Sequence, residues 1–165
     1  MKHKIVYFII YLFTRLIALL PIRLGVMVGS LIGDIAYWMD SKHRHRAMEH
    51  LQRAFGHEKS PQQLIQIARD SYKNMGRSIV ESIYLPDITA STMQRWVAVE
   101  GLSHYIEAHH QKKGVIILTA HFGNWEIIPK LLWSYGHCIH ATVRPLDNPY
   151  LDQLVQEWRR KNGMG

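Results

Sequence analysis

The sequence predicts an α/β fold preceded by a hydrophobic helical hairpin. The first forty residues are much more apolar than the rest, and residues 96–165 alternate short apolar runs with helix-like segments. Short apolar runs between turn signals are typical of buried strands, and helices that alternate with them indicate parallel connections. We therefore expect residues 1–40 to be membrane-associated, residues 41–95 to be helical, and residues 96–165 to form an α/β core built on a mostly parallel sheet with βα units.

The first hydrophobic segment runs from Ile5 to Leu20 and contains fourteen apolar residues in sixteen, after a basic start at Lys2 and Lys4. As a helix it would be about 24 Å long, compared with roughly 30 Å for the hydrocarbon core of a bilayer. It could span a thinned bilayer or lie in the interface. A buried soluble hairpin and a cleaved signal peptide are the alternatives, although no small-x-small cleavage site precedes Pro21.

The second hydrophobic segment carries Gly25, Gly29 and Gly33 at a spacing of four residues. Small residues at this spacing line one helix face and allow another backbone to approach closely, as is common in membranes. With the first segment, it predicts a helical hairpin.

A basic amphipathic helix is expected over residues 41–56. Its apolar stripe is formed by Met48, Leu51 and Phe55. Its outward-facing cations are Arg44, Arg46 and Arg53. Such a helix suits anionic lipid head groups, but a solvated charged face explains the same pattern. Both interpretations stay open.

The remaining elements follow from their boundary residues. Ser60, Pro61 and Gln63 form a helix-start signature, and Pro86 ends that helix. Beyond it we expect, in order, a strand at 96–101, a helix at 102–114, a strand at 115–120, a helix at 125–136, a strand at 138–145 and a helix at 148–163.

Charge and residue types limit the partners. The chain has 20 Lys and Arg against 13 Asp and Glu, a formal charge of +7. Such a surface favours anionic partners, namely nucleic acid, anionic lipid or an acidic carrier protein. The single cysteine, Cys138, excludes an internal disulfide framework and a cysteine-rich zinc module. The eleven histidines show no metal-ligand spacing, so no metal site is expected.

The stretch "HFGNWE" indicates acid–base chemistry. His121 directly follows the expected strand at 115–120, at the sheet edge where ligands gather. In one continuous helix, Glu126 would lie about 140° around the axis from His121, so the pair makes sense only across a turn. Gly123 and Asn124 supply that turn. A carboxylate on one imidazole nitrogen would leave the other nitrogen as a general base.

The nucleophile for this base is expected to come from the substrate. The sequence has no GxSxG motif, and Cys138 stands seventeen residues after His121 with no sequence reason to meet it. A substrate hydroxyl deprotonated by His121 would fill the role. The simpler alternative is that His121 and Glu126 are a polar pair that caps a helix.

Two blocks carry a resemblance to a known family. "LTAHFGNWE" matches an HxxxxD/E block, and "RPLDNPYLDQLVQEWRRKNG" matches the arginine-containing block that follows it. "SKHRHRAMEHLQRAFG" and "VEGLSHY" match the lead-in segments, with His50 where an asparagine is common. The sequence resembles the lipid A biosynthesis acyltransferase family, the bacterial enzymes that add lauroyl or myristoyl chains to lipopolysaccharide precursors.

The resemblance implies roles for individual residues. His121 would be the base and Glu126 its partner. Arg144 and Arg159 would bind phosphate or transition-state charge, for which a planar guanidinium is well suited, and surface charge is their alternative role. Asn124 is the third candidate substrate-binding residue, its alternative role being to shape the turn.

The resemblance also implies substrates and location. Acyl-acyl carrier protein would be the donor, and a hydroxyl of a lipid A precursor or a related glycolipid the acceptor, at the cytoplasmic face of the bacterial inner membrane. A thioester donor needs neither metal nor cofactor, and no nucleic acid partner is expected. Family members continue past residue 165, so we expect an N-terminal portion whose sheet is incomplete and which lacks full activity alone. The alternative is a non-catalytic membrane-associated remnant that binds anionic lipid or acyl carrier protein.

Overall fold

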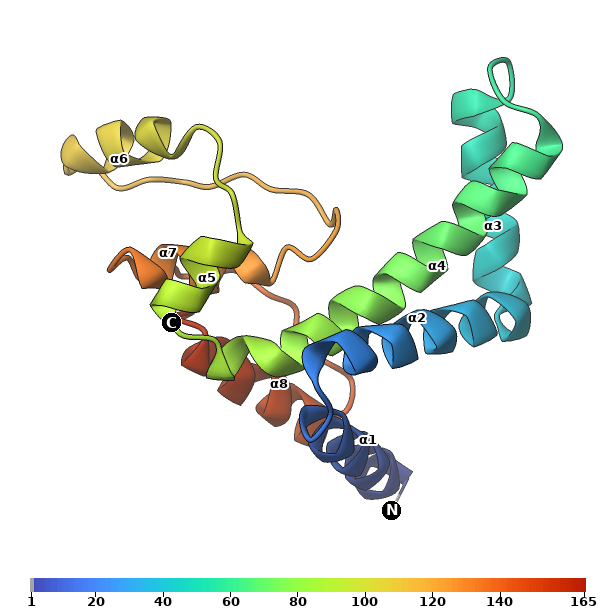
Figure 1. The fold of residues 1–165 in the computed structure, drawn as a ribbon, viewed down its shortest axis with the longest axis horizontal. Coiled ribbons are helices and arrows are strands. Elements are labelled where there is room, and N and C mark those ends of the chain that lie inside the picture. The colour runs from blue at the N-terminus through green and yellow to red at the C-terminus, as the bar shows by residue number, and fades with distance from the viewer. Residues whose placement is uncertain (1) are drawn as a thin grey trace.

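The computed structural model describes residues 2–165, and regular structure in that range is helical. The elements are α1 (Lys2–Ala18), α2 (Ile22–Met39), α3 (Ser41–Phe55), α4 (Pro61–Tyr84), the 3₁₀ helix η1 (Leu85–Asp87), α5 (Ala90–Trp96), α6 (Leu102–His110), α7 (Ile127–Ser134) and α8 (Pro149–Lys161). Helix α4 is the long diagonal of the molecule in Figure 1. Helices α5 to α8 gather near its C-terminal end, and α3 lies at the opposite end.

The expected parallel sheet with βα units is wrong. Within residues 2–165 the structure contains no strand, and an isolated parallel bridge between Ile139 and Met164 is the β-type pairing it shows. The apolar run at 115–120 is irregular chain, in which Ile116 and Leu118 are 97% and 96% exposed. An apolar run predicts a buried strand only if neighbouring strands pair with its backbone groups, and local pattern cannot show whether they do.

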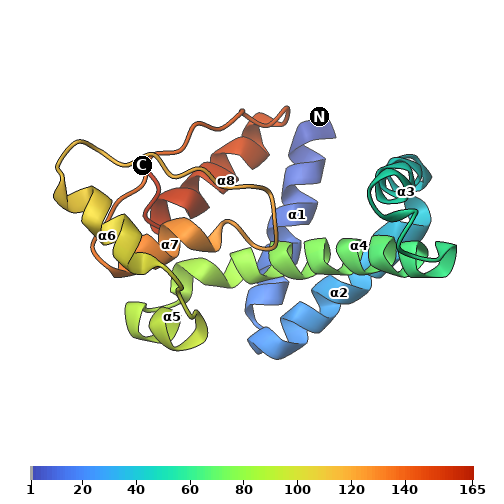
Figure 2. The ribbon, with the colours of Figure 1, turned by 90° about the horizontal axis from the view of Figure 1, so that it is seen from above.

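The glycine stripe of α2 packs against α4. A Cβ atom added to Gly29 would lie 2.5 Å from the carbonyl oxygen of Gly76, and one added to Gly33 would collide with the backbone at Tyr72. The two helices run side by side in both views (Figures 1 and 2). Close backbone approach was therefore correctly predicted, but the partner is α4 rather than α1. The expected hairpin of the first two helices is not the main packing unit.

The helix boundaries follow from capping side chains. At the start of α4, the Ser60 hydroxyl accepts from the Gln63 backbone N–H and the Gln63 side chain accepts from the Ser60 backbone N–H. The capping box predicted from the sequence is thus confirmed. Asn148 caps α8, with Pro149 in its first turn. These bonds satisfy backbone donors that would otherwise lack partners.

Two small apolar clusters hold the helices together. Ile17 of α1 packs with Val80 and Ile83 of α4. Leu85, Met93 and Leu131 join η1, α5 and α7 in the second cluster. The second cluster fixes α7, and therefore the chain that precedes it, against the C-terminal end of α4.

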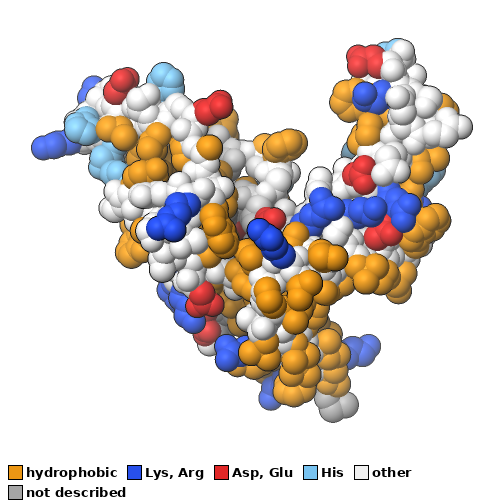
Figure 3. All heavy atoms as spheres, in the orientation of Figure 1, with side chains coloured by type: hydrophobic (Ala, Val, Ile, Leu, Met, Phe, Trp, Pro, Cys, Tyr) orange, Lys and Arg blue, Asp and Glu red, His pale blue; other side chains and the backbone are white. Residues whose placement is uncertain are grey.

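A large apolar surface lies over α1 and α2. Figure 3 shows hydrophobic side chains crowded over the lower part of the molecule, whereas Lys and Arg follow the upper edge of α4. By length and composition, α2 is the described helix that could cross a membrane, although a soluble core helix or a signal sequence can meet the same criteria.

Candidate functional site

The "HFGNWE" segment lies between α6 and α7 and ends at the start of α7. Gly123 has a φ of +57°, in the left-handed region that glycine enters at little cost. The expected turn is therefore present at Gly123. Glu126 occupies the position just before α7, rather than lying within the helix.

His121 lies on the surface. Its ring centroid is 4.3 Å from that of Trp125, with the two planes tilted by 48°. Across residues 2–165, no hydrogen bond joins the His121 ring to the Glu126 carboxylate. His121 and Glu126 thus lie on either side of the turn at Gly123. An acid–base pair between them stays a prediction.

Glu126 binds Arg159 of α8 instead. The Arg159 guanidinium donates to Glu126 Oε1 at 2.6 Å from Nη2, and its Nε lies 3.3 Å and 3.4 Å from the two carboxylate oxygens. The Arg159 and Glu126 side chains are only 19% and 22% exposed, respectively. Charged hydrogen bonds of this forked kind are stronger than neutral ones, and partial burial reduces their screening. Two sequence-predicted site residues thus meet, although they were expected to act on different groups.

Asn124 ties the turn to α4. Its side-chain amide donates to Glu81 at 3.0 Å, and its carbonyl oxygen accepts from the Ser82 hydroxyl at 3.3 Å. These bonds satisfy the Asn124 side chain, which supports the turn-shaping role that the sequence left open. Substrate binding by Asn124 stays a prediction.

Arg144 lies apart from this network. It pairs with Asp147 at 3.3 Å, and both side chains are close to 90% exposed. Such exposed pairs contribute little to stability, so this guanidinium can exchange its partner readily. A role for Arg144 in anion binding is still a prediction.

Lys130 is a buried cation that sequence reasoning missed. Its ammonium donates to the Pro86 carbonyl at 3.2 Å, and its residue is 8% exposed. Burial lowers the pKa of Lys130 below its usual value. In sequence, Lys130 occupies a position of an apolar helix that would be expected to face solvent. In the fold, α5 and η1 pack against α7, and Lys130 is buried. Glu81 and Ser82 were missed for the same reason, since their partner lies more than forty residues away.

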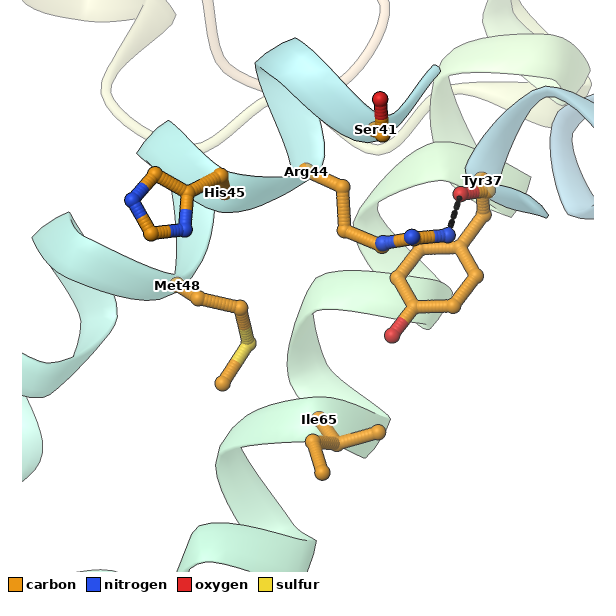
Figure 4. A pocket seen from close by; sticks show the side chains of 6 residues that line it. All are labelled: Tyr37, Ser41, Arg44, His45, Met48 and Ile65. Atoms are coloured by element: carbon orange, nitrogen blue, oxygen red, sulfur yellow. Dashed lines mark hydrogen bonds between the residues drawn. The ribbon is translucent and has the colours of Figure 1, made fainter. Parts of the chain in front are cut away.

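Two grooves lie away from "HFGNWE". One, of about 550 Å³, is lined by Tyr37, Ser41, Arg44, His45, Met48 and Ile65, between α2, α3 and α4 (Figure 4). There Arg44 Nη1 donates to the Tyr37 carbonyl at 2.8 Å and so satisfies the C-terminal end of α2. A smaller groove of about 230 Å³ lies beside η1 and α5.

Metal ligands do not converge among the described residues. No group of three or more His, Cys, Asp or Glu side chains in residues 2–165 could hold a metal ion. The segment itself offers an exposed imidazole beside Trp125 and a neighbouring carboxylate–guanidinium pair.

The chain is similar to one protein family and to several bacterial proteins. The family described as bacterial lipid A biosynthesis acyltransferase matches residues 1–165. A lipid A biosynthesis acyltransferase of Haemophilus influenzae is 29% identical over 96 residues, which cover 58% of this chain and 30% of the relative. The lipid A biosynthesis palmitoleoyltransferase and lauroyltransferase of Escherichia coli are 26% and 25% identical over 148 residues, with 87% and 88% of this chain covered.

The chain spans less than half the length of these relatives, 46% for the two Escherichia coli proteins. No solved structure matches it.

Proposed function

Since the chain belongs to the bacterial lipid A biosynthesis acyltransferase family, we propose that it serves as the catalytic portion of an enzyme that transfers a fatty acyl chain to a hydroxyl of a lipid A precursor. The observation that carries this proposal is the family match over residues 1–165, which includes "HFGNWE". The names of the relatives specify lauroyl and palmitoleoyl transfer, and therefore do not fix the acyl chain here.

The proposed reaction needs one base. His121 takes the proton of the acceptor hydroxyl, and the hydroxyl oxygen attacks the thioester carbonyl carbon of acyl-acyl carrier protein. A new C–O bond forms, the C–S bond breaks, and the imidazolium returns its proton to the departing thiolate. The surface position of His121 supports this role, since a base must reach the hydroxyl that it deprotonates.

Glu126 and Arg159 would act together in this scheme. In the structure, the guanidinium neutralises the carboxylate at 2.6 Å. An anionic substrate group that drew Arg159 away would free Glu126 to turn towards His121. Arg144, which is exposed and weakly held, would bind a phosphate of the acceptor.

Charge and apolar surface support the proposed location and donor. A net charge of +7 favours encounter with an acidic carrier protein, and the apolar surface over α1 and α2 suits a membrane. We place the protein at the bacterial inner membrane, with "HFGNWE" facing the cytoplasm.

A second candidate function has one observation in its favour. Because Glu126 is held by Arg159 and is not hydrogen-bonded to His121, the chain can also act as a non-catalytic module that binds anionic lipid or acyl carrier protein at the membrane. Under this alternative, vesicle binding would persist in a His121→Ala protein, and no transfer would be detected from any acyl carrier protein thioester.

The test is an acyl-transfer assay with radiolabelled acyl-acyl carrier protein and a lipid A precursor, using the protein as the cell produces it. We expect transfer by the wild-type protein and a loss of at least about 100-fold for His121→Ala and for Glu126→Ala. His110→Ala is the matched control, because His110 is another exposed histidine outside the segment. Near-normal activity of the His121 and Glu126 variants would end the catalytic proposal.

A further inference from the structure

Helix α2 has two opposite faces. Leu24, Met27, Leu31, Ile35 and Trp38 follow one another at spacings of three or four residues, and each is between 48% and 66% exposed. At about 100° per residue they form a single stripe. The glycines that contact α4 lie on the other side of the helix.

Helix α4 presents the opposite character on its outer side. The side of α4 turned away from α2 carries Asp70, Asn74, Arg77 and Glu81 at helical spacing. There Gln66 donates to Asp70 at 3.0 Å, and Arg77 donates to Asn74 at 3.1 Å. The paired helices are therefore a two-layer element with one apolar outer face and one charged outer face (Figure 3).

This pairing opposes a transmembrane position for α2. The α2–α4 contact is backbone to backbone, so a spanning α2 would take α4 into the hydrocarbon with it. Charged residues at the centre of a bilayer cost about 2.5–3.5 kcal/mol each on insertion scales, and α4 has several. Asp34 of α2 is itself bound by Arg69 of α4, at 2.7 Å from Nη2 to Oδ2, which holds the pKa of Asp34 below its usual value.

The ends of α2 indicate what covers its apolar face. Arg23 lies at the N-terminal end, and Lys42 and Arg46 follow the C-terminal end; all three are exposed. Cations near a membrane surface gain about 1 kcal/mol each from anionic lipid, and tryptophan prefers the head-group level. A second copy packed on this same face offers these cations little, because Asp34 and Asp40, at this helix, are already bound by Arg69 and His43.

We propose that α2 lies in the plane of the membrane–water interface, with its apolar stripe in the lipid and α4 on the aqueous side. The α2–α4 pair then acts as a platform that holds the "HFGNWE" segment, which Asn124 ties to α4, at a fixed height above the lipid. This inference rests on the membrane location proposed above, but not on acyl transfer.

The test measures the depth of α2 residue by residue. In a Cys138→Ser background, which removes the native cysteine, Leu24→Cys, Met27→Cys, Leu31→Cys and Ile35→Cys each carry a nitroxide spin label. Each 165-residue variant is bound to vesicles of phosphatidylethanolamine and phosphatidylglycerol. Depth comes from the relative quenching by oxygen, which enters lipid, and by a nickel chelate, which stays in water. Asn74→Cys on the polar side of α4 is the matched control.

We expect all four α2 labels to lie at the same shallow depth, about 5–10 Å below the head groups, and the Asn74→Cys label to stay in water. A spanning α2 would separate the labels at positions 24 and 35 by about 16 Å along the bilayer normal, which would overturn the proposal. Labels shielded from both quenchers would also overturn it, in favour of a protein partner, as would labels fully open to water.

Vesicle flotation of the unlabelled variants separates this inference from its premise. If the protein does not float with vesicles, the membrane location is refuted. The acyl-transfer assay described above tests the proposed reaction independently of this result. Circular dichroism checks that each variant is folded. A variant that loses helicity is replaced by Ile32→Cys or Met39→Cys, which are 41% and 80% exposed on the same helix.

Discussion

Gly29 of α2 is the position where the α2–α4 contact can be tested most sharply. A Cβ atom there would lie 2.5 Å from the Gly76 carbonyl oxygen and 2.8 Å from a Val80 methyl group. Ordinary contact begins at 3.4 Å, so Gly29→Ala must move the two helices apart by about 0.9 Å. The Gly76 oxygen belongs to the backbone and cannot rotate away. The strain therefore falls on the helix pair.

The free-energy change has two terms of opposite sign. Alanine favours a helix over glycine by about 1 kcal/mol, whereas overpacking a close contact costs about 1–3 kcal/mol. Because the clash involves backbone on both helices, we expect the cost to be near its upper end and the net loss to be about 1–2 kcal/mol. Such a loss lowers the melting temperature by about 2–8 °C.

Thermal unfolding followed by circular dichroism in mild detergent measures this change. Leu31→Ala, on the exposed side of the same helix, is the control and should stay within about 0.5 kcal/mol of the wild type. If Gly29→Ala is as stable as the wild type, or more stable through its higher helix propensity, then the backbone contact between α2 and α4 does not exist in solution.

Three further predictions concern the surroundings of the candidate site. Arg159→Ala should lower the free energy of unfolding by about 1–3 kcal/mol, because it leaves the Glu126 carboxylate partly buried without its guanidinium; urea unfolding measures it. Asn124→Ala should lower it by about 1–2 kcal/mol, since Glu81 and Ser82 each lose a partner. In the wild type, the free energy of unfolding should rise as pH increases towards 10.5, because the buried Lys130 loses its proton; Lys130→Met should remove this rise, and urea unfolding at a series of pH values measures it.

Proton linkage sets how the buried Lys130 side chain affects stability at different pH. Burial lowers the pKa of Lys130 in the folded protein, so the unfolded chain holds more protons as pH approaches the ordinary lysine pKa. The stability of the wild type should therefore rise relative to that of Lys130→Met as the pH increases towards 10.5, and equal slopes would contradict the burial. For Arg159, a double-mutant cycle with Glu126→Gln should show coupling, and additive losses would mean that the pair does not form.

Local signals in the sequence were the reliable ones. The capping box at Ser60 and Gln63 and the turn at Gly123 each depend on residues within a few positions, and the structure has both. The glycine stripe of α2 correctly predicted a close helix contact, but its partner Gly76 lies more than forty residues away and has no local signature.

Contacts between distant segments could not be predicted. The run at 115–120 has the composition of a buried strand, but whether a strand forms depends on partners that composition does not encode, and Ile116 and Leu118 are almost fully exposed. In the same way, "HFGNWE" shows that His121 and Glu126 are close along the chain. It does not show that Arg159, thirty-three residues later, binds the carboxylate.

The central claim is that His121 is the base for acyl transfer to a lipid hydroxyl. Its most direct test is the initial rate of transfer from acyl-acyl carrier protein to a lipid A precursor, measured for His121→Ala beside His110→Ala in equally folded samples. The account predicts that only the His121 variant loses activity, by at least about 100-fold. Equal rates for the two variants would contradict it.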